Sequence, residues 1–175
     1  VRHHVVQGAI PERVVASAQA LRDSGLVPQF IDAARTLQAE GAAAITTSCG
    51  FLVLLQQQLQ SAVQVGLVTS SLVQLPALLA SDPQVGVLAI SAQRLGPEHL
   101  LAAGVPPDRI DDVLVQGVDP QGEFARAILG NDGSMDVERA RCDVVAAACA
   151  LRRRAPGLRM AVLECTNMPP HADAA

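Results

Sequence analysis

Two cysteines lie in similar local sequence contexts and are candidates for acid–base chemistry. Cys49 follows a short apolar run and three hydroxyl residues, and Gly50 and a second apolar segment come next. Cys165 follows the apolar run 160–163 and Glu164. Both patterns predict a buried strand, a sharp turn and the start of a helix. Free N–H groups and the helix dipole at such a turn favour a thiolate, the reactive form of cysteine.

Two thiols that face each other across a cleft suit the inversion of a stereocentre. One thiolate removes a proton from a carbon, and the other thiol delivers a proton to the opposite face. Neighbouring hydroxyl, amide and backbone N–H groups can hold a substrate carboxylate. The side chains in question are Thr47, Ser48, Thr166 and Asn167.

Each of these residues also has a purely structural interpretation. A buried cysteine in a chain rich in Ala and Val commonly acts as a small apolar residue, and we interpret Cys142 and Cys149 in this way. For Cys49 and Cys165 both interpretations stay open. Hydroxyl clusters at strand ends also serve as helix caps. Glu164 could tune Cys165 or face solvent.

Composition narrows the class of protein. The chain has 175 residues, half of them apolar, and a net charge of −4, which argues against nucleic acid as a partner. Arg152, Arg153 and Arg154 lie near the expected end of a helix, where cations suit the dipole. No apolar run suits a membrane span, and no signal peptide is visible. Four cysteines without close pairing or metal spacing indicate a reducing cytoplasm and no bound metal. The four histidines show no ligand-like spacing, so we interpret them as surface or structural residues.

Segments with strand and helix patterns alternate along the chain. Expected strands are 3–7, the run before Cys49, 63–68, 85–90, 111–116 and 159–163. Expected helices are 27–40, 51–60, 72–80, 97–103, 121–129 and 136–154, and 11–21 is expected to be a helix or an irregular turn. This alternation predicts an α/β fold with a parallel sheet covered on both faces, in which ligands bind beyond the carboxyl ends of the strands. Ser70, Ser71 and Ser91 are at such ends, together with the two cysteines.

The two cysteine segments resemble those of the aspartate/glutamate racemase family. They read TTSCGF at 46–51 and LECTNMPP at 163–170, and they are most similar to a bacterial branch with Cys-Gly-Phe at the first site. The resemblance implies two Rossmann-like lobes related by a pseudo-twofold axis, with the active site between them. The first lobe is expected to comprise 1–71 with 166–175, incomplete at both ends, and the second 72–165. A homodimer is implied as well.

The resemblance also implies racemisation or epimerisation of aspartate, glutamate or a related small carboxylate, without pyridoxal phosphate or metal. Carried over by position, Cys49 and Cys165 are the acid–base pair. The substrate-binding neighbours are Thr47, Ser48, Gly50, Ser70, Ser71, Thr166 and Asn167.

One departure from the family pattern concerns the first site. Amino-acid racemases of this family have Cys-Asn-Thr there, whereas this chain has Cys49-Gly50-Phe51. This departure concerns the identity of the substrate. Alternatives with the same fold are a maleate isomerase, an enzyme similar to arylmalonate decarboxylase, and a carboxylate-binding protein without turnover.

Overall fold

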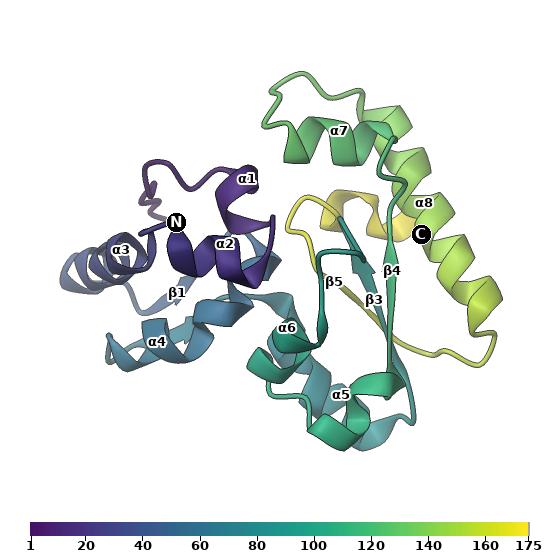
Figure 1. Cartoon of the computed structure of the whole chain (residues 1–175), viewed down its shortest axis with the longest axis horizontal. Helices are drawn as coiled ribbons and strands as arrows, with labels where there is room; N and C mark the ends of the chain where they lie inside the picture. The colour runs from purple at the N-terminus through teal and green to yellow at the C-terminus, as the bar shows by residue number, and fades with distance from the viewer. Residues whose placement is uncertain (175) are drawn as a thin grey trace.

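The computed structural model describes residues 1–174, which form a mixture of helices and short strands (Figure 1). The strands are β1 (Ala44–Thr46), β2 (Gly66–Val68), β3 (Val85–Ala89), β4 (Val113–Gly117) and β5 (Ala161–Leu163). The α-helices are α1 (Pro11–Val14), α2 (Ala18–Asp23), α3 (Val27–Ala39), α4 (Gln56–Ser61), α5 (Leu75–Ser81), α6 (Pro97–Ala102), α7 (Glu123–Leu129) and α8 (Val137–Arg154). The 3-10 helices are η1 (Gly50–Leu55), η2 (Ser71–Gln74), η3 (Pro107–Asp112) and η4 (Pro169–Ala174).

The strands form two small parallel sheets. In the first, β1 pairs with β2, and Ile45 lies opposite Leu67. In the second, the order is β4-β3-β5, with Val87 opposite both Val115 and Val162. The predicted α/β class with parallel strands is therefore confirmed, with two separate sheets in place of one.

The central strand of the larger sheet has the composition that a strand covered on both faces requires. All five residues of β3 are buried, and the sequence is continuously apolar, as expected for parallel strands. Helix α8 packs against β3 and β4, while α5 contacts β3. Figure 1 shows α8 along the right-hand side of this sheet and α5 at its lower end.

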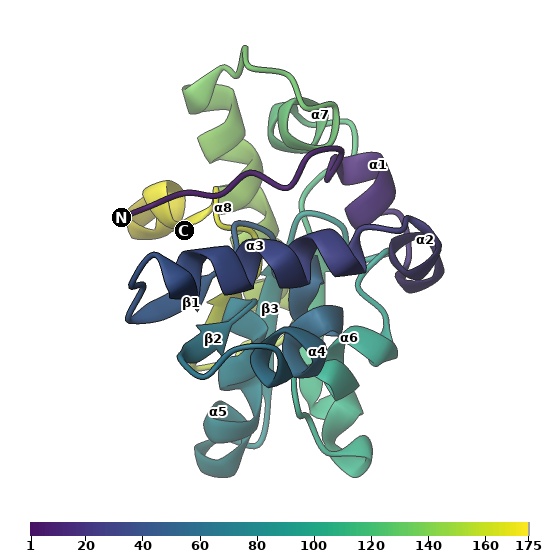
Figure 2. The ribbon, with the colours of Figure 1, turned by 90° about the vertical axis from the view of Figure 1, so that its left-hand side faces the viewer.

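The smaller sheet is covered by α3 and α4, which contact each other and the strands β1 and β2 (Figure 2). The amides of Gln56 and Gln60 on α4 bond to the backbone of β2. Gln56 donates to Leu67 O at 2.8 Å and Gln60 accepts from Leu67 N at 2.7 Å. These bonds hold the end of β2, and therefore the Ser70–Ser71 turn, in a defined place.

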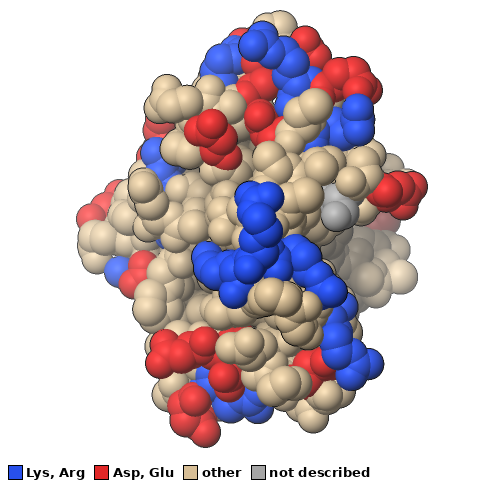
Figure 3. All heavy atoms as spheres, turned by 90° about the vertical axis from the view of Figure 1, so that its right-hand side faces the viewer, with Lys and Arg blue, Asp and Glu red and all other residues tan. Residues whose placement is uncertain are grey.

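Helix α8 begins and ends as its sequence predicts. The Asp136 side chain accepts hydrogen bonds from the backbone N–H groups of Glu138 and Arg139, the arrangement of an N-cap. The three arginines occupy the last turn, and Arg154 donates to Val115 O at 2.9 Å. Figure 3 shows the arginine-rich surface on this side of the molecule. The structural interpretation of the arginine run is thus confirmed.

Several elements differ from the expectation. The segment 11–21 is divided into α1 and α2, and the expected helix 51–60 into η1 and α4. Residues 3–7 form no strand: no other strand pairs with this short segment, and most of it is exposed. The expected helix 72–80 is divided into η2 and α5, with Pro76 in the first turn of α5, where a missing N–H costs nothing. None of the helices in residues 1–174 combines the length and apolarity needed to cross a bilayer.

Candidate functional site

Both cysteines follow the carboxyl end of a parallel strand, as predicted. Cys49 comes three residues after β1 and is the N-cap of η1, and Cys165 comes two residues after β5. Cys49 is half-buried, whereas Cys165 is 7% exposed. All four cysteines are free thiols, and Cys142 and Cys149 are exposed on α8. The apolar interpretation of these two does not hold, because α8 turns them away from the core.

Two hydrogen bonds hold the Cys165 segment against the rest of the site: one reaches the Cys49 segment, and the other reaches the turn after β2. Thr166 Oγ1 donates to Ser48 O at 2.7 Å, and Ser71 Oγ donates to Leu163 O at 2.7 Å. The first links the residues next to each cysteine, although they are 118 positions apart in the sequence. These bonds bring the thiols close enough for the negative charge of one to raise the pKa of the other.

The thiols border two different cavities. Cys165 lines a cavity of about 450 Å³ together with Thr47, Gly50, Ser70, Ser71 and Thr166. Cys49 and Ser48 line a larger cavity of about 1030 Å³ that extends to the N-terminal residues and α3. Thr46, Thr47, Glu164 and Thr166 border both cavities. The thiols are thus neighbours, but on opposite sides of a common wall.

The carboxylate of Glu164 lies buried between the two cavities. Glu164 is 2% exposed, and its Oε2 accepts a hydrogen bond from the Ile90 N–H at 3.2 Å. Burial raises its pKa to about 7, although the Ile90 N–H acts in the opposite direction. The sequence left Glu164 open between a role beside Cys165 and exposure to solvent. The structure places it inside, where Gly50 leaves room for it.

Burial and Glu164 together hold both thiols in the protonated form. Burial, and then the charge of Glu164, raise the pKa of Cys49 to about 12, against the N–H groups of Phe51 and Leu52. The same two causes raise the pKa of Cys165 to about 11, while the backbone and side chain of Asn167 lower it. The expected helix-turn stabilisation of thiolate is therefore present at both sites but is outweighed. The Asn167 amide lies 3.8 Å from Cys165 Sγ and can donate to it.

Most of the hydroxyls expected to bind substrate already donate their proton to the backbone. Thr47 donates to Thr69 O at 2.6 Å, and Thr166 and Ser71 donate to carbonyls as described above. Ser70 differs, because its Oγ accepts from the Leu72 N–H at 3.1 Å and so keeps its own proton. Among the hydroxyls expected to bind substrate that line the smaller cavity, Ser70 is therefore the one that keeps a proton to donate.

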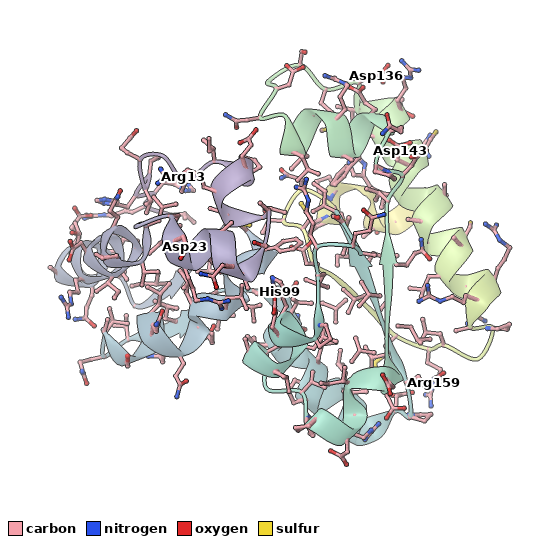
Figure 4. All side chains as sticks on the ribbon, viewed as in Figure 1. Arg13, Asp23, His99, Asp136, Asp143 and Arg159 are labelled. Carbon is pink, nitrogen blue, oxygen red and sulfur yellow. The ribbon has the colours of Figure 1, made fainter. Side chains whose placement is uncertain are left out.

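Two buried histidines support the site region from outside. His99, labelled on α6 in Figure 4, lies edge-on to Phe51 with ring centroids 5.1 Å apart. His171 packs in the same manner against Phe124 at 6.1 Å. Both are buried, so their structural interpretation is confirmed. Residues 1–174 contain no group of three or more His, Cys, Asp or Glu side chains placed to hold a metal ion.

The known proteins that this chain resembles in sequence are named as lyases. A dimethylsulfoniopropionate lyase 3 of Emiliania huxleyi (strain CCMP1516) is 32% identical over 156 residues, which are 83% of this chain and 40% of the relative. A dimethylsulfoniopropionate lyase of Durusdinium sp. clade D is 30% identical over 173 residues, 94% of this chain and 56% of the relative. The chain thus spans about half the length of the curated relatives it matches. No family model matches the chain.

These relatives correct the functional prediction made from the sequence. The expectation of an aspartate/glutamate racemase or epimerase, an isomerase, is wrong, because the matching proteins are named lyases. The alternatives of a maleate isomerase, a relative of arylmalonate decarboxylase and a carboxylate binder without turnover do not match these names either. The physical reason for the error is that a thiol at a strand end predicts removal of a substrate proton. It does not predict whether another bond of the substrate breaks afterwards.

Alanine at position 50 tests the contact between the two cysteine segments. A Cβ on Gly50 would overlap the Glu164 carboxylate and carbonyl oxygens and lie 2.8 Å from Glu164 Cγ. We expect Gly50→Ala to lower the free energy of unfolding by about 1–3 kcal/mol, as overpacking does. The control is Gly66→Ala, since a Cβ there meets nothing within 4 Å. Urea unfolding measures both variants, and equal stability of the two would contradict the tight contact.

Alkylation rates test the protonation of the thiols. At pH 8 a thiol with a pKa of about 11 is ionised in about one molecule in a thousand. Because thiolate is the species that reacts, we expect iodoacetamide to modify Cys49 and Cys165 at least about a hundredfold more slowly than the exposed Cys142 and Cys149. Mass spectrometry of digested samples gives the rate at each cysteine. Modification of all four at similar rates would show that the site does not suppress ionisation.

Proposed function

We propose that this chain carries the proton-transfer site of a lyase that cleaves dimethylsulfoniopropionate. The observation that carries the proposal is that Cys165 and Glu164 line a cavity of about 450 Å³, a size typical of small-molecule sites, with Cys49 close enough for their charges to raise its pKa. The similarity to dimethylsulfoniopropionate lyases supplies the substrate.

The substrate is a propionate with a dimethylsulfonium group on its β-carbon. Elimination removes a proton from the carbon next to the carboxylate, and the C–H electron pair forms the new C=C bond. The C–S bond breaks with its electrons moving to sulfur. The products are acrylate, neutral dimethyl sulfide and the proton held by the base. One base is sufficient for this reaction.

We assign the role of base to Cys165. Cys165 lines the smaller cavity, and Asn167 lies beside its sulfur, where it lowers the pKa of the thiol. A bound sulfonium opposes the effects of burial and of Glu164, because a nearby positive charge lowers the pKa of a thiol. The bound substrate therefore helps to form the thiolate that removes its proton.

The Ser70 hydroxyl is placed to hold the substrate carboxylate in this scheme. It lines the same cavity as Cys165 and keeps a free proton. A hydrogen bond to the carboxylate also stabilises the charge that develops as the neighbouring carbon loses its proton. Thr47, Ser71 and Thr166 act instead by fixing the backbone around the cavity.

The lobes expected from the sequence form part of the proposal. The presence of two sheets supports a division into 1–71 with 166–175 and 72–165. The pseudo-twofold relation between these halves stays a prediction. Cys49 follows a strand of one sheet and Cys165 a strand of the other. The homodimer and the cytoplasmic location stay predictions.

The direct test is incubation of the purified chain with dimethylsulfoniopropionate. Headspace gas chromatography detects dimethyl sulfide, and NMR detects acrylate in equal amount. The Cys142→Ser variant controls for unspecific thiol effects, since Cys142 is exposed on α8. Absence of both products, with the chain folded and its thiols reduced, would refute the proposal for this chain.

A further inference from the structure

We propose that the Glu164 carboxylate binds the positively charged end of the substrate, so that the site selects small carboxylates that also carry a fixed positive charge. This inference rests on the proposed function and deepens it. It concerns which molecules enter the site, whereas the assignment of Cys165 concerns the chemical step.

The position of Glu164 suits this role. Glu164 is a lining residue of both cavities, and one of its carboxylate oxygens, Oε2, is held by the Ile90 N–H just after β3. No hydrogen bond from residues 1–174 reaches the other oxygen, Oε1, which lies over Gly50. The carboxylate is thus anchored at one oxygen and left available at the other.

Glu164 has no cationic partner among the described residues. None of the ion pairs in residues 1–174 includes it, and no arginine or histidine lines the smaller cavity. Buried carboxylates in proteins are normally paired, because the loss of hydration is costly. A bound cation would supply the missing partner.

The chemistry of a sulfonium leaves few other ways to recognise it. A dimethylsulfonium group has no N–H or O–H to donate, so only charge and shape distinguish it. Aromatic side chains commonly surround such cations, but no aromatic residue is among the described residues lining the smaller cavity. Phe51, close to Cys49, is 1% exposed and packs against His99. Glu164 is the one charged residue lining that cavity in the described part of the chain.

A matched pair of ligands isolates the charge. Both ligands carry a carboxylate: 3-(trimethylammonio)propanoate also has a fixed positive charge and is called the cationic ligand, whereas its isostere 4,4-dimethylpentanoate has carbon in place of nitrogen and no positive charge. Neither has a sulfonium leaving group. We expect the wild-type chain at pH 8 to bind the cationic ligand at least about tenfold more tightly, which corresponds to about 1.4 kcal/mol. Isothermal titration calorimetry or ligand-observed NMR measures both affinities.

Two variants assign the preference to one carboxylate. Glu164→Gln keeps the shape and an acceptor for the Ile90 N–H, and should reduce the preference to within about twofold. Glu12→Gln removes an exposed carboxylate on α1, and should retain the full preference. A preference that survives Glu164→Gln, or failure of the wild type to bind either ligand, would overturn the inference.

A titration of the wild type provides a test that needs no Glu164 variant. The preference should be present at pH 8.5 and lost at pH 5.5, because Glu164 takes up its proton near pH 7. The facing Cys49 and Cys165 thiols stay protonated over this range. His3 and His4 also line the larger cavity with Arg2 and Glu40, so a His3→Ala/His4→Ala variant is the control. A preference that does not change with pH would overturn the inference.

The outcomes separate this inference from the proposed lyase activity. Selective binding of the cationic ligand without cleavage of dimethylsulfoniopropionate would leave the role of Glu164 standing and refute the lyase. Cleavage of dimethylsulfoniopropionate without any preference for the cationic ligand would support the lyase and refute the role of Glu164.

Discussion

Replacement of Cys165 by serine is expected to lower kcat/KM for the cleavage of dimethylsulfoniopropionate by about a thousandfold. A positioned general base contributes about 10²–10⁴-fold, and a serine hydroxyl ionises far less readily than a thiol. The loss should appear in kcat with little change in KM, because Cys165 removes the proton but does not hold the carboxylate. Initial rates of dimethyl sulfide release at several substrate concentrations separate the two constants.

The other cysteines provide the controls for this prediction. Cys149→Ser changes an exposed thiol on α8 and should leave both constants unchanged. Cys49→Ser should retain more activity than Cys165→Ser, since an elimination requires one base and Cys49 lines the other cavity. Activity of Cys165→Ser within about tenfold of wild type would remove Cys165 from the role of base.

The secondary structure around the site was predictable because its signals are local. The apolar runs before Cys49 and Cys165 have the length of buried strands, and the glycine or prolines that follow mark turns. The structure confirms β1 and β5 at these places and a 3-10 helix after each cysteine. Parallel pairing followed from the alternation of strands and helices, because a parallel connection requires a crossover.

The roles of the polar side chains were not predictable, because they depend on contacts between distant segments. Ser70 and Ser71 are adjacent and of one type, yet Ser70 caps η2 while Ser71 bonds to Leu163, 92 positions away. Glu164 is buried because its side chain meets Gly50 from the other cysteine segment. A single sequence gives neither of these distances. It also gave no sign that the thiols would border separate cavities.

The sequence pattern predicted a racemase in place of a lyase because the two reactions share their first step. Racemisation and β-elimination both begin with removal of a proton next to a carboxylate, so both require a base beside a carboxylate-binding turn. The sequence patterns around Cys49 and Cys165 predict that requirement. The reaction then depends on what the substrate carries on the next carbon, and a good leaving group there directs the electrons to elimination. The residues that recognise the leaving group, rather than the cysteines, therefore distinguish a lyase from a racemase.

Glu164→Gln is expected to stabilise the protein at pH 8 by about 3 kcal/mol. Burial raises the pKa of Glu164 from 4.5 to about 7, so between these values the folded protein binds a proton there that the unfolded chain has released. Stability from this group is present below pH 4.5 and is lost as the pH rises through 7, at about 1.4 kcal/mol for each pH unit between the two pKa values. Glutamine has no charge to desolvate and keeps an acceptor for the Ile90 N–H.

The stabilisation by Glu164→Gln should therefore depend on pH. Urea unfolding should show a large difference between Glu164→Gln and wild type at pH 8 and nearly none at pH 4, where wild-type Glu164 is protonated. The exposed Glu12→Gln variant should follow the wild type at both values. If Glu164→Gln were equally stable or less stable at pH 8, the carboxylate would have a favourable partner in the folded chain. A stabilising substitution would instead show that Glu164 costs the fold free energy, as expected of a group whose partner is the substrate.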